Sequence, residues 1–350
     1  MRRWADLAEV SVQAYQEVQE GRLRFGLSLL SVRNATVDLY FPSEALLSLW
    51  CAKLEQFCRL HNFHDDYRFL YKQGSGHFGT VFAALEYSSE LTFAVKVVPR
   101  TQRTHLESEI AILRDLKCAT VPQVRKVYED QEKVYLIMQL APGVDIRNYM
   151  ARYGPLSETL TRKIAFSLTR TLAHIHQQRI IHRDIKPENV LIDVRRRSEL
   201  SSVYLVDFGL AIRCDQARAG NCSGTAGYLA PELIKLQEFD CKVDLFSLGV
   251  LTYTMIAGES PFASSTVKRV AYLNSRCRLR FAGAVWKAVP SDCIAFITAL
   301  TSPDPSQRPS AEEALTLTWL SDLQQHYEEL TLGKVTKENT TDSIVSTQSE

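Results

Sequence analysis

Residues 22–31 and 35–41 place apolar side chains at every second position. This is the period of β-strands that bury one face. Residues 43–60 follow with apolar side chains at helical spacing, and Ser43 occupies the position of a helix N-cap. Residues 4–20 carry apolar positions at mixed spacing and support only a weak structural prediction. The N-terminal region is therefore predicted to form two strands and then one helix.

From residue 68 onward the pattern changes to short apolar runs with one amphipathic stretch among them. Residues 68–72, 81–85, 92–98 and 134–138 predict strands. The stretch that opens at Glu109 has the apolar face of a helix.

Helical spacing returns in residues 156–178, which predict one long helix. From about residue 333 the chain is polar with few apolar side chains. Such a segment cannot bury enough surface to offset its conformational entropy. Residues 323–350 are therefore predicted to form a polar tail that is largely disordered from about residue 333.

Composition narrows the class of protein. A chain of 350 residues has room for one large domain with an extra segment at each end. A net charge of +1 argues against a chain-wide basic surface, so no nucleic-acid partner is predicted. The eight cysteines are scattered without zinc-site spacing, as in a reducing compartment. We find neither a signal peptide nor an apolar run of the about 20 residues that a span requires, which predicts a cytoplasmic protein.

Gly74, Gly76 and Gly79 form a G-x-G-x-x-G pattern, which on its own is a weak signal shared with dinucleotide-binding folds. Here the third glycine leads into the strand predicted at 81–85 and not into a helix. The pattern therefore indicates a hairpin. Glycines in such a loop let backbone N–H groups approach phosphates where a Cβ would intrude.

Lys96 alternates with apolar neighbours in the strand predicted at 92–98. A buried, isolated ammonium group is costly, so Lys96 requires an acidic partner. Glu107 and Glu109 are both candidates. They lie two residues apart and should project from different faces of the predicted helix, so only one of them can face Lys96.

Residues 182–189 (HRDIKPEN) and 207–209 (DFG) carry the most specific chemistry of the chain. They supply two acids, a lysine and an amide within a short distance. Phosphoryl transfer needs a carboxylate to orient a hydroxyl group, and a metal held by oxygen ligands to neutralise phosphate charge. The two motifs resemble the catalytic loop and the metal-binding motif of eukaryotic protein kinases.

This resemblance implies an α+β, bilobal protein kinase fold over residues 67–322. The small N-lobe, rich in strands and containing helix αC, would span residues 67–138, and a hinge would follow at 139–143. The larger, mainly helical C-lobe would span 144–322. Residues 1–66 would form an N-terminal extension.

The resemblance also assigns roles around the catalytic loop. Asp184 would accept a hydrogen bond from the substrate hydroxyl, Lys186 would lie over the transferring phosphate, and Thr225 would bridge the two. A lysine two places after the acid is the serine/threonine pattern. Asn189 and Asp207 would hold Mg²⁺. The implied activity is transfer of the ATP γ-phosphate to Ser or Thr hydroxyls of protein substrates.

The resemblance implies that Lys96 pairs with Glu109, that Met138 is the gatekeeper, and that backbone groups of Gln139 and Ala141 face the adenine. The residues implied in binding ATP are Gly74, Gly76, Gly79, Val81, Ala94, Lys96, Glu109, Met138, Gln139, Ala141, Asp145 and Leu191.

Further residues match positions that hold the kinase fold. Glu232 is expected to pair with Arg308, and Asp244 is expected to accept backbone hydrogen bonds from the catalytic loop. Residues 210–232 resemble the activation and substrate-docking segment of kinases, and Asn221 stands where many related kinases carry a phosphorylated threonine. We therefore predict little dependence on phosphorylation of this activation segment.

Asp145 and Glu188 leave two interpretations open. They could select substrates with arginine upstream of the acceptor, or they could form a solvated acidic rim. The runs 205–211 (LVDFGLA) and 258–262 (GESPF) most resemble the calcium/calmodulin-dependent kinase group.

Residues 21–62 weakly resemble the last third of a pleckstrin-homology domain, without the part that usually binds phosphoinositides. A family-specific extension that packs on the kinase is the alternative, and lipid contact follows from neither. Two rival functions are a nucleotide-binding pseudokinase scaffold and an adaptor recruited to membranes through the N-terminal segment.

Overall fold

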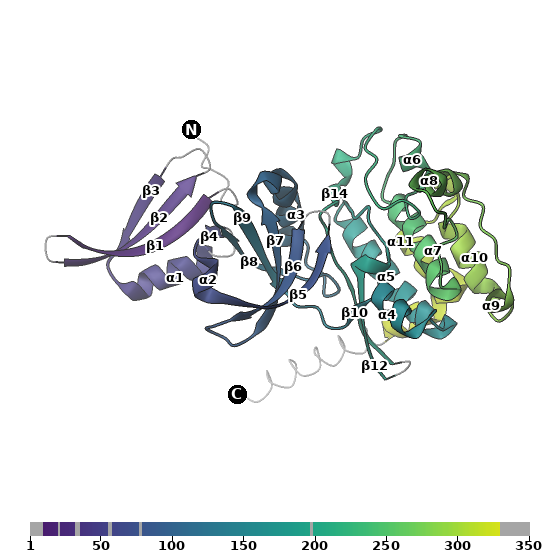
Figure 1. The fold of residues 1–350 in the computed structure, drawn as a ribbon, viewed down its shortest axis with the longest axis horizontal. Helices are drawn as coiled ribbons and strands as arrows, with labels where there is room; N and C mark the ends of the chain where they lie inside the picture. The colour runs from purple at the N-terminus through teal and green to yellow at the C-terminus, as the bar shows by residue number, and fades with distance from the viewer. Residues whose placement is uncertain are drawn as a thin grey trace, which may run out of the picture. The chain divides into compact units, whose positions relative to one another are not determined.

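The structure is a computed structural model that describes residues 10–19, 22–31, 36–54, 58–76, 79–196 and 199–329. The chain divides into two units, Met1–Ala141 and Pro142–Glu350. The first unit is rich in strands and the second in helices (Figure 1). This confirms the predicted α+β fold class with its N-terminal β segment.

Nine strands of the described part of the first unit form a single sheet, in the order β3-β2-β1-β4-β8-β9-β7-β6-β5. Antiparallel pairing dominates, but β4 runs parallel to both of its neighbours. The strands are β1 (Val10–Gln19), β2 (Arg22–Ser31), β3 (Thr36–Phe41), β4 (Arg59–Leu60), β5 (Tyr67–Gly76), β6 (Gly79–Glu86), β7 (Thr92–Pro99), β8 (Val124–Glu129) and β9 (Lys133–Gln139). The helices are α1 (Glu44–Leu54), α2 (Phe63–Asp66) and α3 (Arg103–Asp115), with a 3₁₀ turn, η2, at Arg100–Gln102.

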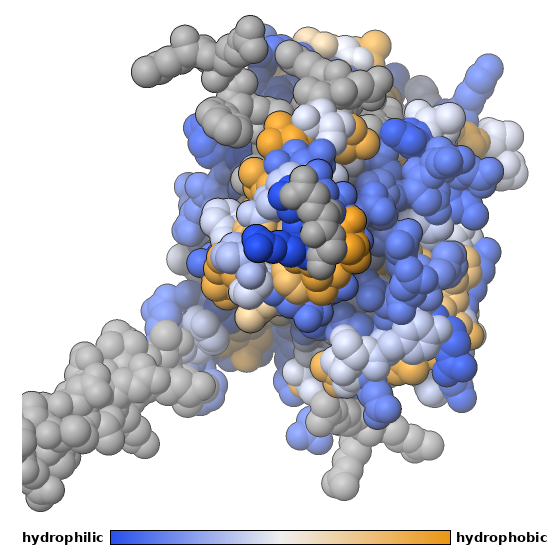
Figure 2. Space-filling model, turned by 90° about the vertical axis from the view of Figure 1, so that its left-hand side faces the viewer, coloured by the Kyte–Doolittle hydropathy of each residue, from blue (hydrophilic) through white to orange (hydrophobic). Residues whose placement is uncertain are grey.

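The N-terminal strands pack against α1 on one face (Figure 1). Their core contains Val10, Val12, Leu27, Leu47 and Cys58, all less than 9% exposed. The outer surface at this end carries apolar side chains among polar ones (Figure 2). Helix α1 exposes some apolar residues. Those residues are Leu46, Leu49 and Trp50.

Two features of this region differ from the prediction. Strand β1 was not predicted, since only its first residues, Val10 and Val12, are buried and most of the rest are exposed. The helix predicted to reach residue 60 ends at Leu54, residues 55–57 lie outside the described residues, and Arg59–Leu60 form β4. Local apolar spacing could not reveal that two residues would leave the helix and join a sheet.

Aromatic side chains hold the centre of the first unit together. The ring of Phe63, on α2, stacks on Tyr135 with centroids 4.4 Å apart and on Tyr67 with centroids 5.4 Å apart. Tyr128 meets Phe63 edge to face at 5.8 Å. Such pairs add to the stabilisation that comes from burying the rings. They bind the start of β5 to the β8–β9 hairpin, and so to the strands that carry Lys96 and Met138.

The second unit has two small sheets and a helical body. One sheet has the order β10-β12-β13 and the other pairs β11 with β14. The strands are β10 (Val144–Asp145), β11 (Ile180–Ile181), β12 (Val190–Arg196), β13 (Glu199–Leu205) and β14 (Ile212–Arg213). The helices are α4 (Ile146–Tyr153), α5 (Glu158–Gln177), α6 (Pro231–Ile234), α7 (Lys242–Ala257), α8 (Val267–Arg276), α9 (Ala284–Lys287), α10 (Ser291–Leu300) and α11 (Ala311–Leu315), and the 3₁₀ turns are η3 (Pro187–Asn189), η4 (Cys214–Gln216) and η5 (Pro305–Gln307).

Helix α7 is the centre of this helical body. It is buried from Val243 to Ile256, as expected for a helix that is apolar on all sides. Helix α5 matches the helix predicted at 156–178 and begins with Ser157 as its N-cap, whose side chain accepts a hydrogen bond from the Leu160 N–H. Helix α5 precedes the catalytic loop in the chain, and α7 carries Asp244, which binds that loop.

The predicted pair of Glu232 and Arg308 is confirmed. Arg308 is 1% exposed and donates to both carboxylate oxygens of Glu232, at 2.7 and 3.2 Å. Its remaining hydrogen bonds reach the carbonyl oxygens of Lys242 and Ser302. A fully paired guanidinium can stay buried, and this one joins α6, α7 and η5.

Part of the predicted tail, residues 323–329, lies within the described residues. Residues 318–329 are helical, so helix continues past the predicted domain end at residue 322. The guanidinium carbon of Arg170, on α5, lies 3.2 Å from the centroid of the Tyr327 ring. Residues 330–350, where disorder was predicted, lie outside the described residues. None of the described helices combines the length and the apolar composition that a membrane span requires.

Candidate active site

The glycine-rich segment forms the predicted hairpin. Gly74 pairs with Val81 and Gly76 pairs with Gly79 between β5 and β6. Residues 77–78, at the tip, lie outside the described residues. Gly79 has φ = +152°, and a Cβ there would lie 2.4 Å from the Val97 carbonyl oxygen. Glycine is therefore required at Gly79 for β6 to lie against β7.

Lys96 lies in β7 and is only 5% exposed. Its Nζ donates to both carboxylate oxygens of Glu109, at 2.8 and 2.9 Å, and Glu109 is 2% exposed on α3. Because the pair is buried and the hydrogen bonds are charge-assisted, it fixes α3 against the sheet. Glu107, the alternative partner, instead bonds Arg59 of β4.

Asp244 anchors the catalytic loop, as predicted. Its carboxylate accepts the backbone N–H groups of His182 at 2.9 Å and Arg183 at 2.8 Å. The ring of His176, at 2.9 Å, is its third partner. Burial by itself disfavours charge on His176, but the hydrogen bond to Asp244 prevails and raises the pKa of His176 to about 9. Arg183 has φ = 65°, a strained left-handed conformation that these bonds hold in place.

Four polar side chains converge just after this anchor. The Thr225 hydroxyl donates to Asp184 Oδ1 at 2.7 Å, and Lys186 Nζ donates to Thr225 Oγ1 at 2.8 Å. Lys186 Nζ also lies 2.6 Å from Asp184 Oδ2. Asn189 Nδ2 donates to the same Oδ2 at 2.9 Å and to the Asp184 carbonyl at 2.8 Å. The Asp184 carboxylate, in a residue 6% exposed, is therefore held in one orientation by three donors.

Gly224 explains how Thr225 reaches this cluster. Its φ is +132°, and a Cβ at this position would lie 2.6 Å from the carbonyl oxygen of Arg183. The activation segment can approach the catalytic loop this closely only with glycine before Thr225.

Strands β12 and β13 bring Asn189 and Asp207 to one end of a hairpin. Val190 pairs with Leu205, and the Val206 N–H donates to the Asn189 carbonyl at 2.9 Å. Since Asn189 uses Nδ2 to bind Asp184, its other side-chain polar atom is the oxygen Oδ1. A carboxylate from Asp207 and an amide oxygen from Asn189 are ligands of the type that Mg²⁺ prefers, so this pair fits the ion.

The remaining residues implied in nucleotide binding are distributed over both units. In the first unit, Ala94 of β7 pairs with Met138 at the end of β9, followed by exposed Gln139 and buried Ala141. In the second unit, Leu191 of β12 pairs with Asp145 of β10. Asp145 caps α4, because its Oδ1 accepts the Asn148 N–H at 2.8 Å.

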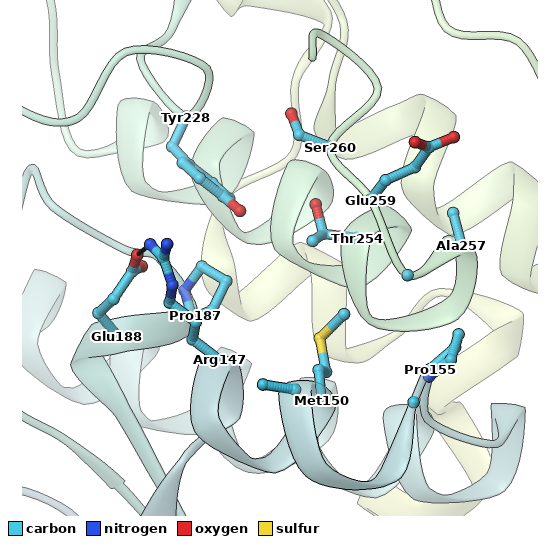
Figure 3. A pocket seen from close by; sticks show the side chains of 13 residues that line it. Arg147, Met150, Pro155, Pro187, Glu188, Tyr228, Thr254, Ala257, Glu259 and Ser260 are labelled. Atoms are coloured by element: carbon cyan, nitrogen blue, oxygen red, sulfur yellow. Dashed lines mark hydrogen bonds and ion pairs between the residues drawn. The ribbon is translucent and has the colours of Figure 1, made fainter.

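A cavity of about 730 Å³ opens beside the catalytic loop in the second unit (Figure 3). Glu188, two residues after Lys186, and Tyr228, three residues after Thr225, contribute to its walls. Arg147 of α4 forms an ion pair with Glu188 at the edge of the cavity. Thr254, Glu259 and Ser260 line other parts of it, with apolar contributions from Met150, Pro155, Pro187 and Ala257.

Two cations in these networks were missed by sequence reasoning. Arg147 carries no motif, and its contact with Glu188 spans 41 residues of sequence. Arg59 lies in a stretch whose apolar spacing suggested a helix. Only the fold reveals the partners of these two side chains.

Comparison with known proteins identifies the family. The model of the protein kinase domain family matches residues 67–320. The chain belongs to the protein kinase family. The match covers both the glycine-rich hairpin and the Asp184 cluster described above.

The kinase domain is similar to several curated proteins at modest identity. Serine/threonine-protein kinase 33 of Bos taurus is 31% identical over 262 residues, which cover 71% of this chain and 54% of that protein. The calcium/calmodulin-dependent protein kinase cmkA of Emericella nidulans is 33% identical over 260 residues, 73% of this chain and 62% of that protein. An Aurora kinase of Schizosaccharomyces pombe is 30% identical over 258 residues, 71% of this chain and 69% of that protein. The chain spans about half the length of the first of these relatives. The resemblance of residues 21–62 to a pleckstrin-homology domain stays a prediction.

Proposed function

We propose that this chain is a serine/threonine protein kinase that uses Mg-ATP to phosphorylate hydroxyl groups of protein substrates. The observation that carries the proposal is the hydrogen-bonded cluster of Asp184, Lys186, Asn189 and Thr225. The names of the similar proteins, which are serine/threonine and calcium/calmodulin-dependent kinases, support the same class of acceptor.

Asp184 is the residue that receives the acceptor hydroxyl. Thr225, Lys186 and Asn189 hold its carboxylate in one orientation, so it is preorganised to accept a hydrogen bond from an incoming Ser or Thr. Lys186 brings a positive charge within 2.6 Å of that carboxylate. A cation at this point offsets negative charge that develops on the transferring phosphoryl group.

Asn189 Oδ1 and the Asp207 carboxylate would hold magnesium. When bound, Mg-ATP supplies the γ-phosphoryl group, and its metal offsets phosphate charge. In the first unit, Lys96 would bind the α- and β-phosphates while Glu109 keeps its ammonium group in place. Backbone N–H groups of the β5–β6 hairpin would cover the phosphates.

Apolar and backbone groups would receive the base and ribose. Met138 would act as gatekeeper, backbone groups of Gln139 and Ala141 would meet the adenine edge, and Asp145 would meet the ribose. The further apolar contacts would come from Val81, Ala94 and Leu191.

Substrate preference would be read at the cavity beside Glu188. Residues that flank the acceptor in a bound peptide would enter it, because Pro187 and Tyr228 in its wall are continuous with the catalytic cluster. Of the two acids for which arginine selection was one of two open interpretations, Asp145 caps α4 and Glu188 is paired with Arg147. Arg147 would therefore compete with a basic substrate residue for Glu188, which weakens a preference for arginine.

The direct test is phosphate transfer from Mg-ATP to peptide libraries that offer Ser/Thr or Tyr as the acceptor. We expect labelled Ser and Thr from the natural protein, and a loss of about 100-fold or more in the Asp184→Asn variant, because the oriented carboxylate is removed. Both proteins should show the same thermal melting. Folded natural protein that binds nucleotide but transfers no phosphate would contradict the proposal and favour the scaffold alternative.

A separate measurement addresses the membrane-recruited adaptor. Sedimentation of the full chain with anionic liposomes would show binding if residues 1–66 recruited it to a membrane. The kinase proposal does not require any such binding.

A further inference from the structure

Strand β4 joins the N-terminal strands to the kinase sheet. Arg59 pairs with Ser11 of β1 on one side and with Val127 of β8 on the other, both in parallel register. Within the described residues, β8 would otherwise be an edge of the sheet, with unpaired N–H and C=O groups. Strands β1, β2, β3 and β4 are therefore part of the same sheet that carries Lys96 (Figure 1).

Arg59 projects from β4 toward two carboxylates, the buried one of Glu129 and the partly exposed one of Glu107. It is 2% exposed, and its two terminal nitrogens donate separately to Glu107 and Glu129. Glu129, in β8, is 7% exposed and also lies 3.0 Å from the Nε of Arg100. Burial lowers the pKa of Arg59, but the hydrogen bonds to Glu107 and Glu129 raise it by more. The pKa is therefore above its ordinary value, and the guanidinium stays charged.

Glu107 and Glu109 lie on the same helix, α3, and point to different faces of it. Residues two apart on an α-helix project roughly 200° from one another. Glu109 binds Lys96 on one face, and Glu107 binds Arg59 on another. The helix is therefore held by a lysine of β7 and by an arginine of the N-terminal extension.

The position of helix α3 depends on ion pairs such as Lys96–Glu109 and Arg59–Glu107. Gln102, its N-cap residue, makes no side-chain capping hydrogen bond, and its first turn contains no acidic residue. A capping side chain and an acidic residue in the first turn usually stabilise the start of a helix. Because α3 has neither, the position of its N-terminal end depends on tertiary contacts. Glu107 lies in the second turn, close to that end.

We propose that Arg59 is a positioning residue for catalysis, through which the N-terminal extension holds α3 and so maintains the Lys96–Glu109 pair. The extension is then an intramolecular activator built into the kinase sheet. Arg59 acts through Glu107 and the helix, and does not touch the substrates. The inference rests on the proposed phosphotransfer only for its effect on rate.

The test compares three variants of the full chain: Arg59→Met, Glu107→Gln and the control Glu129→Gln. Each removes charge from the cluster, but Glu129 lies on β8 and not on α3. We expect Arg59→Met to lower kcat about tenfold or more, because displaced catalytic groups lose alignment. Glu107→Gln should also lower kcat, as Arg59→Met does, with little change in KM for ATP. Glu129→Gln should lower the melting temperature and leave kcat near that of the natural protein.

Hydrogen–deuterium exchange supplies a readout that does not need activity. Arg59→Met and Glu107→Gln should speed exchange in the amides of α3, while Glu129→Gln should not. Faster exchange in α3 without any kinase activity in the natural protein would retain the positioning role and overturn the proposed function. The positioning role would be overturned if α3 exchange were unchanged in both Arg59→Met and Glu107→Gln, or if both variants kept kcat within twofold of the natural protein. It would also be overturned if Glu129→Gln lowered kcat as much as Glu107→Gln does.

Discussion

Arg59 and Arg308 are two deeply buried arginines with opposite consequences for the molecule. Each is at most 2% exposed and is paired with carboxylate groups. Arg308 joins α6, α7 and η5 of the second unit, none of which carries the reacting acid. Arg59 binds Glu107 of α3, and Glu109, on another face of the same helix, binds Lys96. Similar buried charges can therefore serve stability in one place and catalytic alignment in another, depending on what their partners are attached to.

Removing Arg308 should have the largest effect on stability. Arg308→Met leaves the buried carboxylate of Glu232 uncompensated, which costs about 3–5 kcal/mol in comparable cases. Chemical denaturation should report this loss. The rate per folded molecule should change far less than in Arg59→Met.

The pair of the partly exposed Arg162 and the exposed Asp322 is a control for Arg308. Asp322→Asn should cost less than about 1 kcal/mol, because solvent screens the charges. An equal loss in the two variants would show that burial does not distinguish Arg308.

Thr225 should show the reverse of Arg308, with a large effect on rate and a small one on stability. Thr225→Ala removes the hydroxyl between Asp184 and Lys186, and hydrogen bonds to charged groups contribute about 1.5–3 kcal/mol. We expect kcat to fall about ten- to 100-fold, measured by phosphate transfer. Thr225→Ser, which retains the hydroxyl, should recover most of the rate. A serine variant as slow as the alanine variant would contradict this role.

The smallest expected effect is at Arg147, whose ion pair with Glu188 is exposed. Exposed pairs contribute little to stability, so Arg147→Ala should melt like the natural protein. It should however free Glu188 for a basic substrate residue. Peptides with arginine near the acceptor should gain several-fold in kcat/KM over neutral ones, a difference of about 1 kcal/mol. Glu188→Gln should abolish that gain, and an unchanged preference in Arg147→Ala would argue against competition at the cavity.

Comparison of these sites also shows how far the sequence could be interpreted. The Asp184 cluster, the Lys96–Glu109 pair and the Glu232–Arg308 pair lie in segments whose order resembles kinase motifs, so their residues could be named in advance. The two-unit, α+β fold followed from the same resemblance. These predictions needed no knowledge of distances.

Strands β1 and β4 and the partners of Arg59 could not be predicted in this way. Strand β4 has two residues, too few for any apolar period, and β1 is mostly exposed. Arg59 meets Glu107 and Glu129 across 48 and 70 residues of sequence. Long-range ion pairs leave no local pattern, because only tertiary packing selects the partner.

A double-mutant cycle between Arg59 and Glu109 tests the central comparison most directly. The kcat values of Arg59→Met, Glu109→Gln and the double variant would be measured on folded protein under one condition. If Arg59 acts through the Lys96–Glu109 pair, the two fold-losses in kcat should not multiply. The double variant should then be about as slow as Glu109→Gln alone. If Arg59 serves stability only, as Arg308 does, Arg59→Met should leave kcat unchanged, and independent action on the rate would make the losses multiply. Either result would contradict the account.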